Sequence, residues 1–405
     1  MSKDTFCPMP FVTLTVNPGN YISRCMMSMT PMGPIEKSTY SNEKFKTLRN
    51  NMLNGVWDEI GCESCFFKEK HGLNSQRTKW LAREEKYLRE TGLYEKNKNI
   101  DRNRIYHLYM NFNNICNFKC RMCGPGFSNA WIPDYMQLEK EFQKSVVPAK
   151  QQVDVDKFLY EYGPELSDIR QIWITGGEPF MDNSIFDFFK KLKNYCSLDN
   201  IIVTINTNGS KIDIEKIQNL NQLKKLHINV SVDSTDDYYT YMRGYNFTFS
   251  DLNYNLKQLM EINRNNNKFL LTINGAFQLY NILNVERFYE WCNEITENKN
   301  ADWIEYRVLT GPKYLQARHA PESIKQQCRE QVNRLIVKYP NNFYLSDLLT
   351  ELNHSSDPHM INKFLMFNNQ LDKIRNTNLN ELFPELVSEW IREGKINENI
   401  NKWQQ

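Results

Sequence analysis

Three closely spaced cysteines are the strongest chemical signal in the chain. Cys116, Cys120 and Cys123 form a C-x3-C-x2-C run directly after an apolar stretch. Three thiolates at this spacing can ligate three irons of a cubane [4Fe–4S] cluster and leave the fourth iron open to an external ligand, whereas an electron-transfer cluster takes a fourth cysteine. Buried cysteines clustered by chance and a zinc site are the alternatives, and zinc is disfavoured because no fourth ligand stands at finger spacing.

Glycines and polar groups follow the next apolar stretches. Gly176, Gly177 and Glu178 come directly after Ile172–Thr175. Glycines there let the backbone approach a ligand, and the carboxylate can accept hydrogen bonds from an ammonium group. Later stretches also end in polar side chains, namely Asn208, Ser231, Asp233 and Arg243. Each of these alone is an ordinary turn feature, but their joint order predicts a ligand site at successive strand ends.

Four further cysteines lie upstream in a separate group. Cys7, Cys25, Cys62 and Cys65 have the spacing C-x17-C-x36-C-x2-C, which places one thiol before a predicted hairpin, one after it and a close pair later. Four cysteines are the right number for one metal site. The spacing suits tetrahedral Zn²⁺ as well as an iron–sulfur cluster, so both remain open on spacing alone.

The elements that position these groups alternate between strands and helices from about residue 104. Apolar stretches predict six strands, at Ile105–Phe112, Ile169–Thr175, Ile201–Asn206, Leu226–Val232, Phe269–Phe277 and Trp303–Leu309. Amphipathic segments such as Asn183–Tyr195 and Leu252–Ile262 predict helices between them. This order is typical of an α/β fold with a parallel sheet. Six strands favour a partial (β/α)6 TIM-like barrel, whose site lies at the carboxyl ends of the strands.

We expect three units along the chain. Residues 1–103 form a small cysteine-rich module, which contains a hairpin from Phe11–Val16 and Tyr21–Arg24 and ends in a charged helical connector from about Lys79. Residues 104–312 form the barrel. Residues 313–405 form a helical extension, with helices expected at Glu322–Val337, Asn342–Leu352, Asn362–Arg375 and Leu379–Arg392.

The composition excludes several classes of protein. Lys+Arg total 50 against 48 for Asp+Glu, so charge gives no reason to expect nucleic acid or an anionic membrane as a partner. No stretch approaches the ~20 apolar residues of a membrane span, and the first residues lack the pattern of a signal peptide. We therefore expect a cytoplasmic protein, in which the 10 cysteines stay reduced and point to metal or redox chemistry.

Two smaller features complete the inventory. Cys196, Cys292 and Cys328 stand alone beside apolar residues and are expected to be buried structural thiols. A basic and aromatic stretch runs from Tyr306 to His319, near the expected barrel mouth. It can be a solvated loop or a binding site for an anionic substrate.

Taken together, these motifs resemble the radical S-adenosylmethionine (radical SAM) superfamily, over residues 104–312. Cys116, Cys120 and Cys123 match its cluster motif, and Gly176, Gly177 and Glu178 match the motif that holds the amino group of the cosubstrate. By the same resemblance Asn208, Ser231, Asp233 and Arg243 contact the ribose and carboxylate, and the adenine lies near Met122 and Val308. The resemblance implies reductive cleavage of S-adenosylmethionine at a [4Fe–4S] cluster, which yields a 5′-deoxyadenosyl radical that abstracts a substrate hydrogen.

The upstream cysteines resemble the auxiliary cluster module of twitch or SPASM-type relatives, here placed before the barrel. The resemblance implies that Cys7, Cys25, Cys62 and Cys65 hold a second [4Fe–4S] cluster, with structural zinc as the alternative. It also implies a peptide or protein substrate that is oxidised or cross-linked, and a flavodoxin- or ferredoxin-type electron donor. A small amino-acid, sugar or nucleotide substrate is the alternative. A catalytically inactive binding protein on the same scaffold is the alternative of another class.

Overall fold

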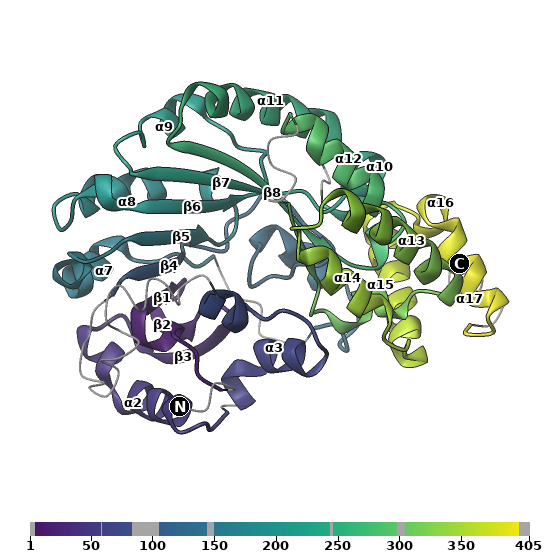
Figure 1. Ribbon diagram of the computed structural model, residues 1–405, viewed down its shortest axis with the longest axis horizontal. Coiled ribbons are helices and arrows are strands. Elements are labelled where there is room, and N and C mark those ends of the chain that lie inside the picture. The colour runs from purple at the N-terminus through teal and green to yellow at the C-terminus, as the bar shows by residue number, and fades with distance from the viewer. Residues whose placement is uncertain are drawn as a thin grey trace.

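A single sheet of nine strands organises the computed structural model, which describes residues 5–57, 59–82, 105–143, 150–243, 246–297 and 304–396. The strand order is β3-β2-β1-β4-β5-β6-β7-β8-β9 (Figure 1). The strands are β1 Thr13–Asn17, β2 Tyr21–Cys25, β3 Ser28–Pro34, β4 His107–Asn111, β5 Gln171–Thr175, β6 Ile202–Thr207, β7 Lys225–Ser231, β8 Phe269–Phe277 and β9 Glu305–Val308.

The six strands β4 to β9 are those predicted from the sequence, and each is parallel to the next. Their consecutive order confirms the α/β partial barrel. The strands end within two residues of the predicted bounds, except at the start of the last strand, where Trp303 lies outside the described residues. The loops after the strands therefore meet at one edge of the sheet, as the site prediction requires.

Helices cover one face of this parallel sheet (Figure 1). They are α7 Val155–Tyr162, α8 Ser184–Leu192, α9 Ile214–Gln218, α10 Asp236–Met242, α11 Phe249–Asn265 and α12 Val285–Ile295. The predicted apolar stripe of α8 is buried, and Phe188 packs against Phe112 with ring centres 5.6 Å apart. Alternation along the strands sends the apolar side chains, such as Ile172 and Ile174, to this covered face.

The opposite face of the sheet is polar. Asn229 donates to Asn206 (3.0 Å) and accepts from Thr272 (3.0 Å), so hydrogen bonds link β6, β7 and β8 on this inner face. Glu305 and Arg307 alternate with buried Tyr306 and Val308 along β9 and also lie on the inner face. A barrel interior lined with amides, hydroxyls and charges is suited to a polar ligand.

The amino-terminal strands extend the same sheet. Residues Met9–Val12 form a short helix, α1, so β1 begins at Thr13 and not at Phe11 as predicted. β1 pairs with β2 as the predicted hairpin and runs parallel to β4, which joins it to the barrel. The helices α2 Glu43–Leu53 and α3 Glu59–Lys70 follow. Residues 79–82 of the predicted connector are helical. The rest of it and the boundary at residue 103 fall in residues 83–104, outside the described residues, so the three-unit division stays a prediction.

The carboxyl-terminal residues form the predicted helical extension. Its helices are α13 Glu322–Lys338, α14 Tyr344–Leu352, α15 Pro358–Arg375, α16 Leu379–Leu382 and α17 Pro384–Arg392. The last two were predicted as one helix, but Pro384 lacks the N–H that would continue it and starts a new one. Among the described helices, none is long and apolar enough to cross a membrane.

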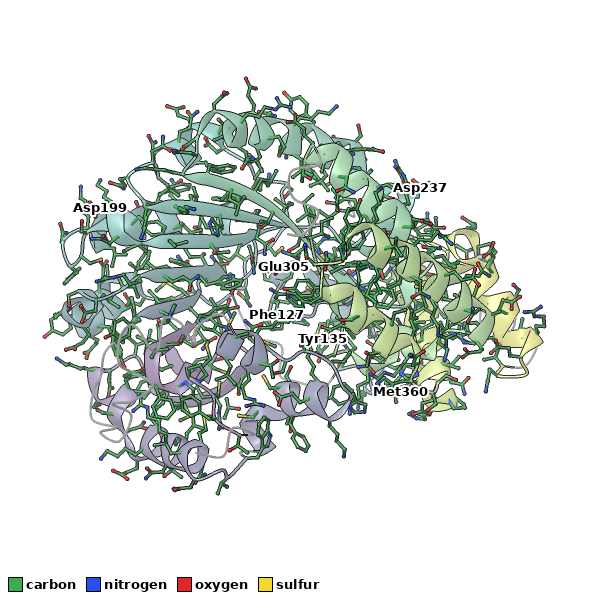
Figure 2. All side chains as sticks on the ribbon, in the orientation of Figure 1. Phe127, Tyr135, Asp199, Asp237, Glu305 and Met360 are labelled. Atoms are coloured by element: carbon green, nitrogen blue, oxygen red, sulfur yellow. The ribbon has the colours of Figure 1, made fainter. Side chains whose placement is uncertain are left out.

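The carboxyl ends of the strands point toward this extension. In the view of Figure 2, Phe127 and Glu305 lie centrally between the sheet and the helical extension, whereas Asp199, which precedes β6, marks the far edge. The loops that carry the predicted site residues therefore lie on the side of the barrel that faces the extension.

Candidate functional site

The loop after β4 carries the three closely spaced cysteines. A hydrogen bond from Cys123 N to Cys120 O (2.9 Å) closes the turn between them, and Cys120 is 5% exposed. Burial raises the pKa of the Cys116 thiol to about 12. A hydrogen bond with Cys123 lowers the pKa of Cys120 to about 7, whereas the same bond and burial raise that of Cys123. The Cys123 thiol thus stabilises the Cys120 thiolate by a hydrogen bond, and the thiolate is the form that binds iron.

The glycines after β5 let a second loop pack against the cysteine loop. Glu178 N donates to Ile115 O (2.7 Å), one residue before Cys116. Gly176 and Gly177 have φ of +97° and +46°, and a Cβ on either would lie 2.0 Å from an atom of the cysteine loop or of the strand before it. Close backbone packing therefore requires both glycines.

Glu178 is completely buried, and its carboxylate accepts three hydrogen bonds. The donors are Asn208 N (2.6 Å), Thr207 Oγ1 (2.7 Å) and Phe180 N (3.1 Å). Burial raises the pKa of this carboxyl, and these hydrogen bonds oppose the rise. Glu178 thus fixes the turn after β6, with at most one lone pair left for a ligand.

We expect Glu178→Gln to weaken the binding of S-adenosylmethionine by about tenfold or more, since one charge-assisted hydrogen bond is worth about 1.5–3 kcal/mol. The amide nitrogen also faces N–H donors, which loosens the turn at Asn208. Anaerobic titration of the reconstituted variant measures the affinity, and Glu161→Gln near the carboxyl end of α7, where the carboxylate accepts from Lys37 N (3.0 Å), is the control. Wild-type affinity with an intact cluster would show that Glu178 has no part in binding.

The other predicted polar residues converge on the same cysteines. Asn208 Nδ2 lies 3.8 Å from Cys116 Sγ, and Arg243 O lies 3.8 Å from Cys120 Sγ. Arg243 donates to Asp233 Oδ2 (2.5 Å), and the second oxygen of Asp233 accepts from Ala276 N (2.6 Å). Arg243 Nε is buried and has no partner among the described residues. This donor is available to a carboxylate ligand.

The remaining predicted contacts are less direct. Ser231 is the last residue of β7 and is partly exposed at the carboxyl edge. Met122 is partly buried between the cysteines of the loop. Val308 is 6% exposed and lies on the helix-covered face with Tyr306, which stacks on Phe288 at 4.6 Å, so only its backbone faces the inside. Their roles toward the adenine and ribose stay predictions.

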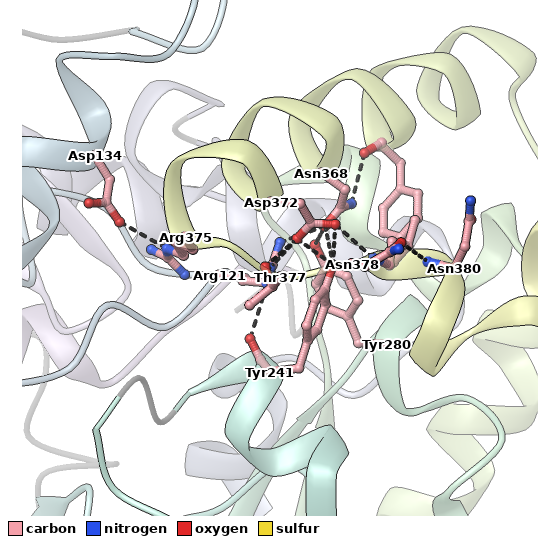
Figure 3. A network of polar contacts seen from close by, with 12 residues as sticks. Arg121, Asp134, Tyr241, Tyr280, Asn368, Asp372, Arg375, Thr377, Asn378 and Asn380 are labelled. Carbon is pink, nitrogen blue, oxygen red and sulfur yellow. Dashed lines mark hydrogen bonds and ion pairs between the residues drawn. The ribbon is translucent and has the colours of Figure 1, made fainter. Parts of the chain in front are cut away.

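The sequence analysis missed Arg121, which lies inside the cysteine run. Its side chain has no exposed surface and reaches α15, where it donates to Asp372 Oδ1 (2.5 Å) and Asn368 Oδ1 (2.9 Å) (Figure 3). Its Nε donates to Tyr241 O (3.0 Å), and its guanidinium lies 3.5 Å from the centre of the Tyr241 ring. The sequence holds one signal for its role: an arginine stands between two cysteines that are predicted to bind iron. Its acidic partner is 251 residues away.

A second ion pair braces the same loop from α15. Arg375 Nε donates to Asp134 Oδ2 (2.8 Å), and Lys119 Nζ donates to the other oxygen of Asp134 (2.9 Å). The Arg375 guanidinium lies 4.6 Å from the centre of the Trp131 ring, and Trp131 Nε1 donates to Cys120 O (2.8 Å). The helical extension therefore holds the cysteine loop at two points.

The four amino-terminal cysteines line one pocket, although they come from four different positions along the module. Its empty volume is about 510 Å³, and its lining includes Cys7, Cys25, Cys62 and Cys65. Cys7 precedes α1, Cys25 ends β2, and the pair lies on α3. The four thiols are close enough that each of the other three raises the pKa of Cys7, in addition to the effect of burial. The structure therefore brings together the residues that the spacing grouped.

Two arginines and several apolar side chains complete this pocket. Arg77 pairs with Glu69, donates to Phe6 O (3.0 Å) and lies 5.4 Å from the centre of the Trp57 ring. Arg24 also lines the pocket. Thiolates are soft ligands that bind the irons of an iron–sulfur cluster, and the nearby arginines offset their negative charge. Thiolates are also common ligands of zinc. No group of three or more Cys, His, Asp or Glu in the described ranges is arranged to hold a single ion.

Family comparison identifies the barrel. Residues 110–275 match the model of the Radical SAM superfamily. This segment spans β4 to β8 and contains Cys116, Cys120, Cys123 and Glu178. The chain therefore contains a radical SAM domain, and the cofactors that this domain implies are a [4Fe–4S] cluster and S-adenosylmethionine.

Curated relatives match part of the chain. A GTP 3′,8-cyclase of Alkaliphilus oremlandii is 26% identical over 149 residues, which are 36% of this chain and 41% of the relative. A GTP 3′,8-cyclase of Sulfurimonas denitrificans is 28% identical over 130 residues, 32% of this chain and 35% of the relative. The chain thus spans less than half the length of these relatives.

Solved structures are similar to this chain at low sequence identity. An S-adenosylmethionine-bound structure of anSMEcpe has a TM-score of 0.41 at 15% identity, over 60% of this chain and 59% of that one. Streptococcus suis SuiB bound to the precursor peptide SuiA has a TM-score of 0.41 at 14% identity, over 62% and 50% of the two chains. Similarity at this level does not indicate a substrate.

Proposed function

We propose that the protein is a radical SAM enzyme with its cleavage cluster on Cys116, Cys120 and Cys123. The observation that carries the proposal is the convergence of three separate loops on these thiols, which places Asn208 and Arg243 within 3.8 Å of two of the sulfurs. Three thiolates hold three irons and leave one open for the cosubstrate. Arg243 Nε, buried and unpartnered in the described structure, is our candidate donor to the methionine carboxylate.

A [4Fe–4S] cluster held by Cys116, Cys120 and Cys123 would supply the electron that cleaves S-adenosylmethionine, and the 5′-deoxyadenosyl radical so formed would abstract a hydrogen from the substrate. The chain contributes position and exclusion of water. Asp233 holds Arg243, Glu178 holds the Asn208 turn, and burial of Cys120 keeps solvent from one thiol.

We propose a second [4Fe–4S] cluster on Cys7, Cys25, Cys62 and Cys65, with structural zinc as the competing occupant. Four thiolates fill all four iron positions, which favours electron relay over direct binding of substrate. A flavodoxin- or ferredoxin-type protein would supply the electron for cleavage. The proposed compartment is the cytoplasm, where thiols stay reduced, and all 10 cysteines are free thiols in the structure.

For the substrate we propose a peptide or protein that is oxidised or cross-linked. A second candidate is a small amino-acid, sugar or nucleotide substrate. The polar inner face of the barrel supports a ligand of either kind with many hydrogen-bonding groups. The GTP 3′,8-cyclase relatives favour the second candidate, although their match spans only 149 and 130 residues.

One experiment separates an enzyme from an inactive binding protein on the same scaffold. We expect the anaerobically reconstituted protein to form 5′-deoxyadenosine from S-adenosylmethionine and dithionite even without substrate. Chromatography of the quenched mixture measures it. A protein that carries its full complement of iron and forms none would contradict the proposed function.

A further inference from the structure

We propose that Arg307 and Lys79, with Lys68 as a further cation nearby, bind an anionic oxygen group of the substrate, a carboxylate or a phosphate, beside the inner face of β9. This inference rests on the proposed function, and it means that the substrate of the enzyme carries a negatively charged group. The three cations come from β9, from α3 and from the segment after α3, so the sequence does not group them.

Arg307 presents an unused donor to the inside of the barrel. It stands on the polar face of β9, in register with Ala276 of β8, and its side chain is 33% exposed. One terminal nitrogen pairs with Glu305, and the guanidinium also bonds to Tyr344 of α14. Its Nε is buried and has no partner among the described residues. A guanidinium in this state can bind a further carboxylate or phosphate oxygen.

Tyr344 connects Arg307 to Lys79. Lys79 Nζ lies 4.0 Å from the centre of the Tyr344 ring and 5.0 Å from that of Phe343. Tyr344 is itself 3% exposed, so its ring orients the ammonium group and keeps it beside the guanidinium. The arrangement places two cations on one aromatic side chain.

The nearby carboxylates make few direct ion pairs with this group. Asp347 accepts hydrogen bonds from Asn74 N (3.0 Å) and Asn74 Nδ2 (2.9 Å). Glu351 forms a bidentate salt bridge with Arg318. Glu305 pairs with Arg307. Within the part of the chain that is described, neither Lys68 nor Lys79 forms an ion pair. Among the described residues, the three cations thus have one directly bonded carboxylate, Glu305, and a second carboxylate, Asp347, near both lysines.

Electrostatics agrees with an excess of positive charge. Burial, with Arg307 and Lys68 nearby, lowers the pKa of Lys79 to about 7, and Asp347 and Glu305 only partly oppose this. Burial and Arg307 also lower the pKa of Lys68. Like charges held together in a low dielectric are unfavourable, and a bound anion removes the cost.

The group lies near the amino-terminal pocket. Tyr109 of β4 accepts a hydrogen bond from Thr175 Oγ1 (2.8 Å), and its hydroxyl interacts electrostatically with both Arg307 and Cys25. Arg318 and His319, which the sequence grouped with Arg307, lie elsewhere in the extension. Arg318 is paired with Glu351, and His319 accepts from Asp357 N (3.1 Å). Arg307, by contrast, stands on the inner face of β9.

The test uses the reconstituted full-length protein and two probe anions, inorganic pyrophosphate and citrate, with chloride at equal ionic strength as the reference. We expect isothermal titration to detect binding of at least one probe, and Arg307→Ala to weaken it by about tenfold or more. A preference for pyrophosphate indicates a phosphate-bearing substrate, and one for citrate a carboxylate. Arg334→Gln, at an exposed ion pair with Glu286, is the control.

Proton uptake gives a second readout. Because an anion raises the pKa of Lys79, binding near pH 8 should take up protons, as measured by titration in buffers of different ionisation enthalpy. Lys79→Met should reduce this uptake, and it carries the test if Arg307→Ala fails to fold.

Binding of neither probe, or equal weakening by Arg334→Gln, would overturn the anion site. Formation of 5′-deoxyadenosine by the wild type is measured separately, so failure of the proposed function and failure of the anion site are distinguishable.

Discussion

Replacing Cys116, Cys120 and Cys123 together by Ala is expected to abolish the formation of 5′-deoxyadenosine and to halve the iron content, from about eight to about four irons per chain. The reason is that these thiols are the proposed ligands of the cleavage cluster, whereas the pocket of Cys7, Cys25, Cys62 and Cys65 is built from separate elements. Iron and sulfide analysis after anaerobic reconstitution, with chromatography of 5′-deoxyadenosine, measures both effects.

The controls separate the two cysteine groups. Cys196→Ala changes a partly buried thiol outside both groups and should leave iron and activity unchanged. Replacing Cys62 and Cys65 should remove the other half of the iron while 5′-deoxyadenosine still forms. About four irons and one zinc in the wild-type protein would instead assign zinc to the amino-terminal pocket. Full iron in the triple variant would refute the proposed ligands.

The barrel could be predicted from the sequence because its strands are buried on one face and follow one another in order. Each strand is a short run of apolar residues. The helices between them have apolar residues three or four positions apart, which form one buried face, as in α8. The site followed from this, since the residue after a parallel strand must lie at the carboxyl edge. Asn208, which directly follows β6, lies near Cys116 as this rule leads one to expect.

The amino-terminal strands were harder to predict, because some of their residues are unfavourable in strands. β3 was not predicted because Pro31 and Pro34 lie within it, and proline is tolerated there only because β3 is an edge strand. The pairing of β1 with β4 joins residues 94 positions apart, as Thr13 and His107 show. No local signal encodes such a pairing.

The role of the helical extension was likewise invisible in the sequence. Asp372 and Arg375 look like ordinary charges of an amphipathic helix. Their partners are Arg121 and Asp134, in the segment that follows β4, and only the fold brings them together. The extension is therefore part of the support of the cysteine loop, in addition to its contacts with β9 and α12.

The buried pair of Arg121 and Asp372 should have the largest effect on stability of any single contact described. Asp372 also accepts from Tyr241 Oη (3.0 Å), Thr377 Oγ1 (2.7 Å) and Leu379 N (2.7 Å). We expect Asp372→Ala to lower the free energy of unfolding by about 3–5 kcal/mol, because it leaves the Arg121 cation buried without a counter-charge. Chemical denaturation of the reconstituted variant measures this.

The same change should loosen the cysteine loop specifically. We expect a chelator to remove about half of the iron faster from Asp372→Ala than from the wild type, since only one of the two proposed clusters lies on the loop that Arg121 anchors. Glu286→Gln breaks an exposed pair with Arg334 and should cost no more than about 1 kcal/mol with no change in iron release. The double variant Arg121→Met with Asp372→Ala should recover part of the lost stability, because it removes the uncompensated charge. Equal losses in Asp372→Ala and Glu286→Gln would mean that the extension does not hold the loop through this pair.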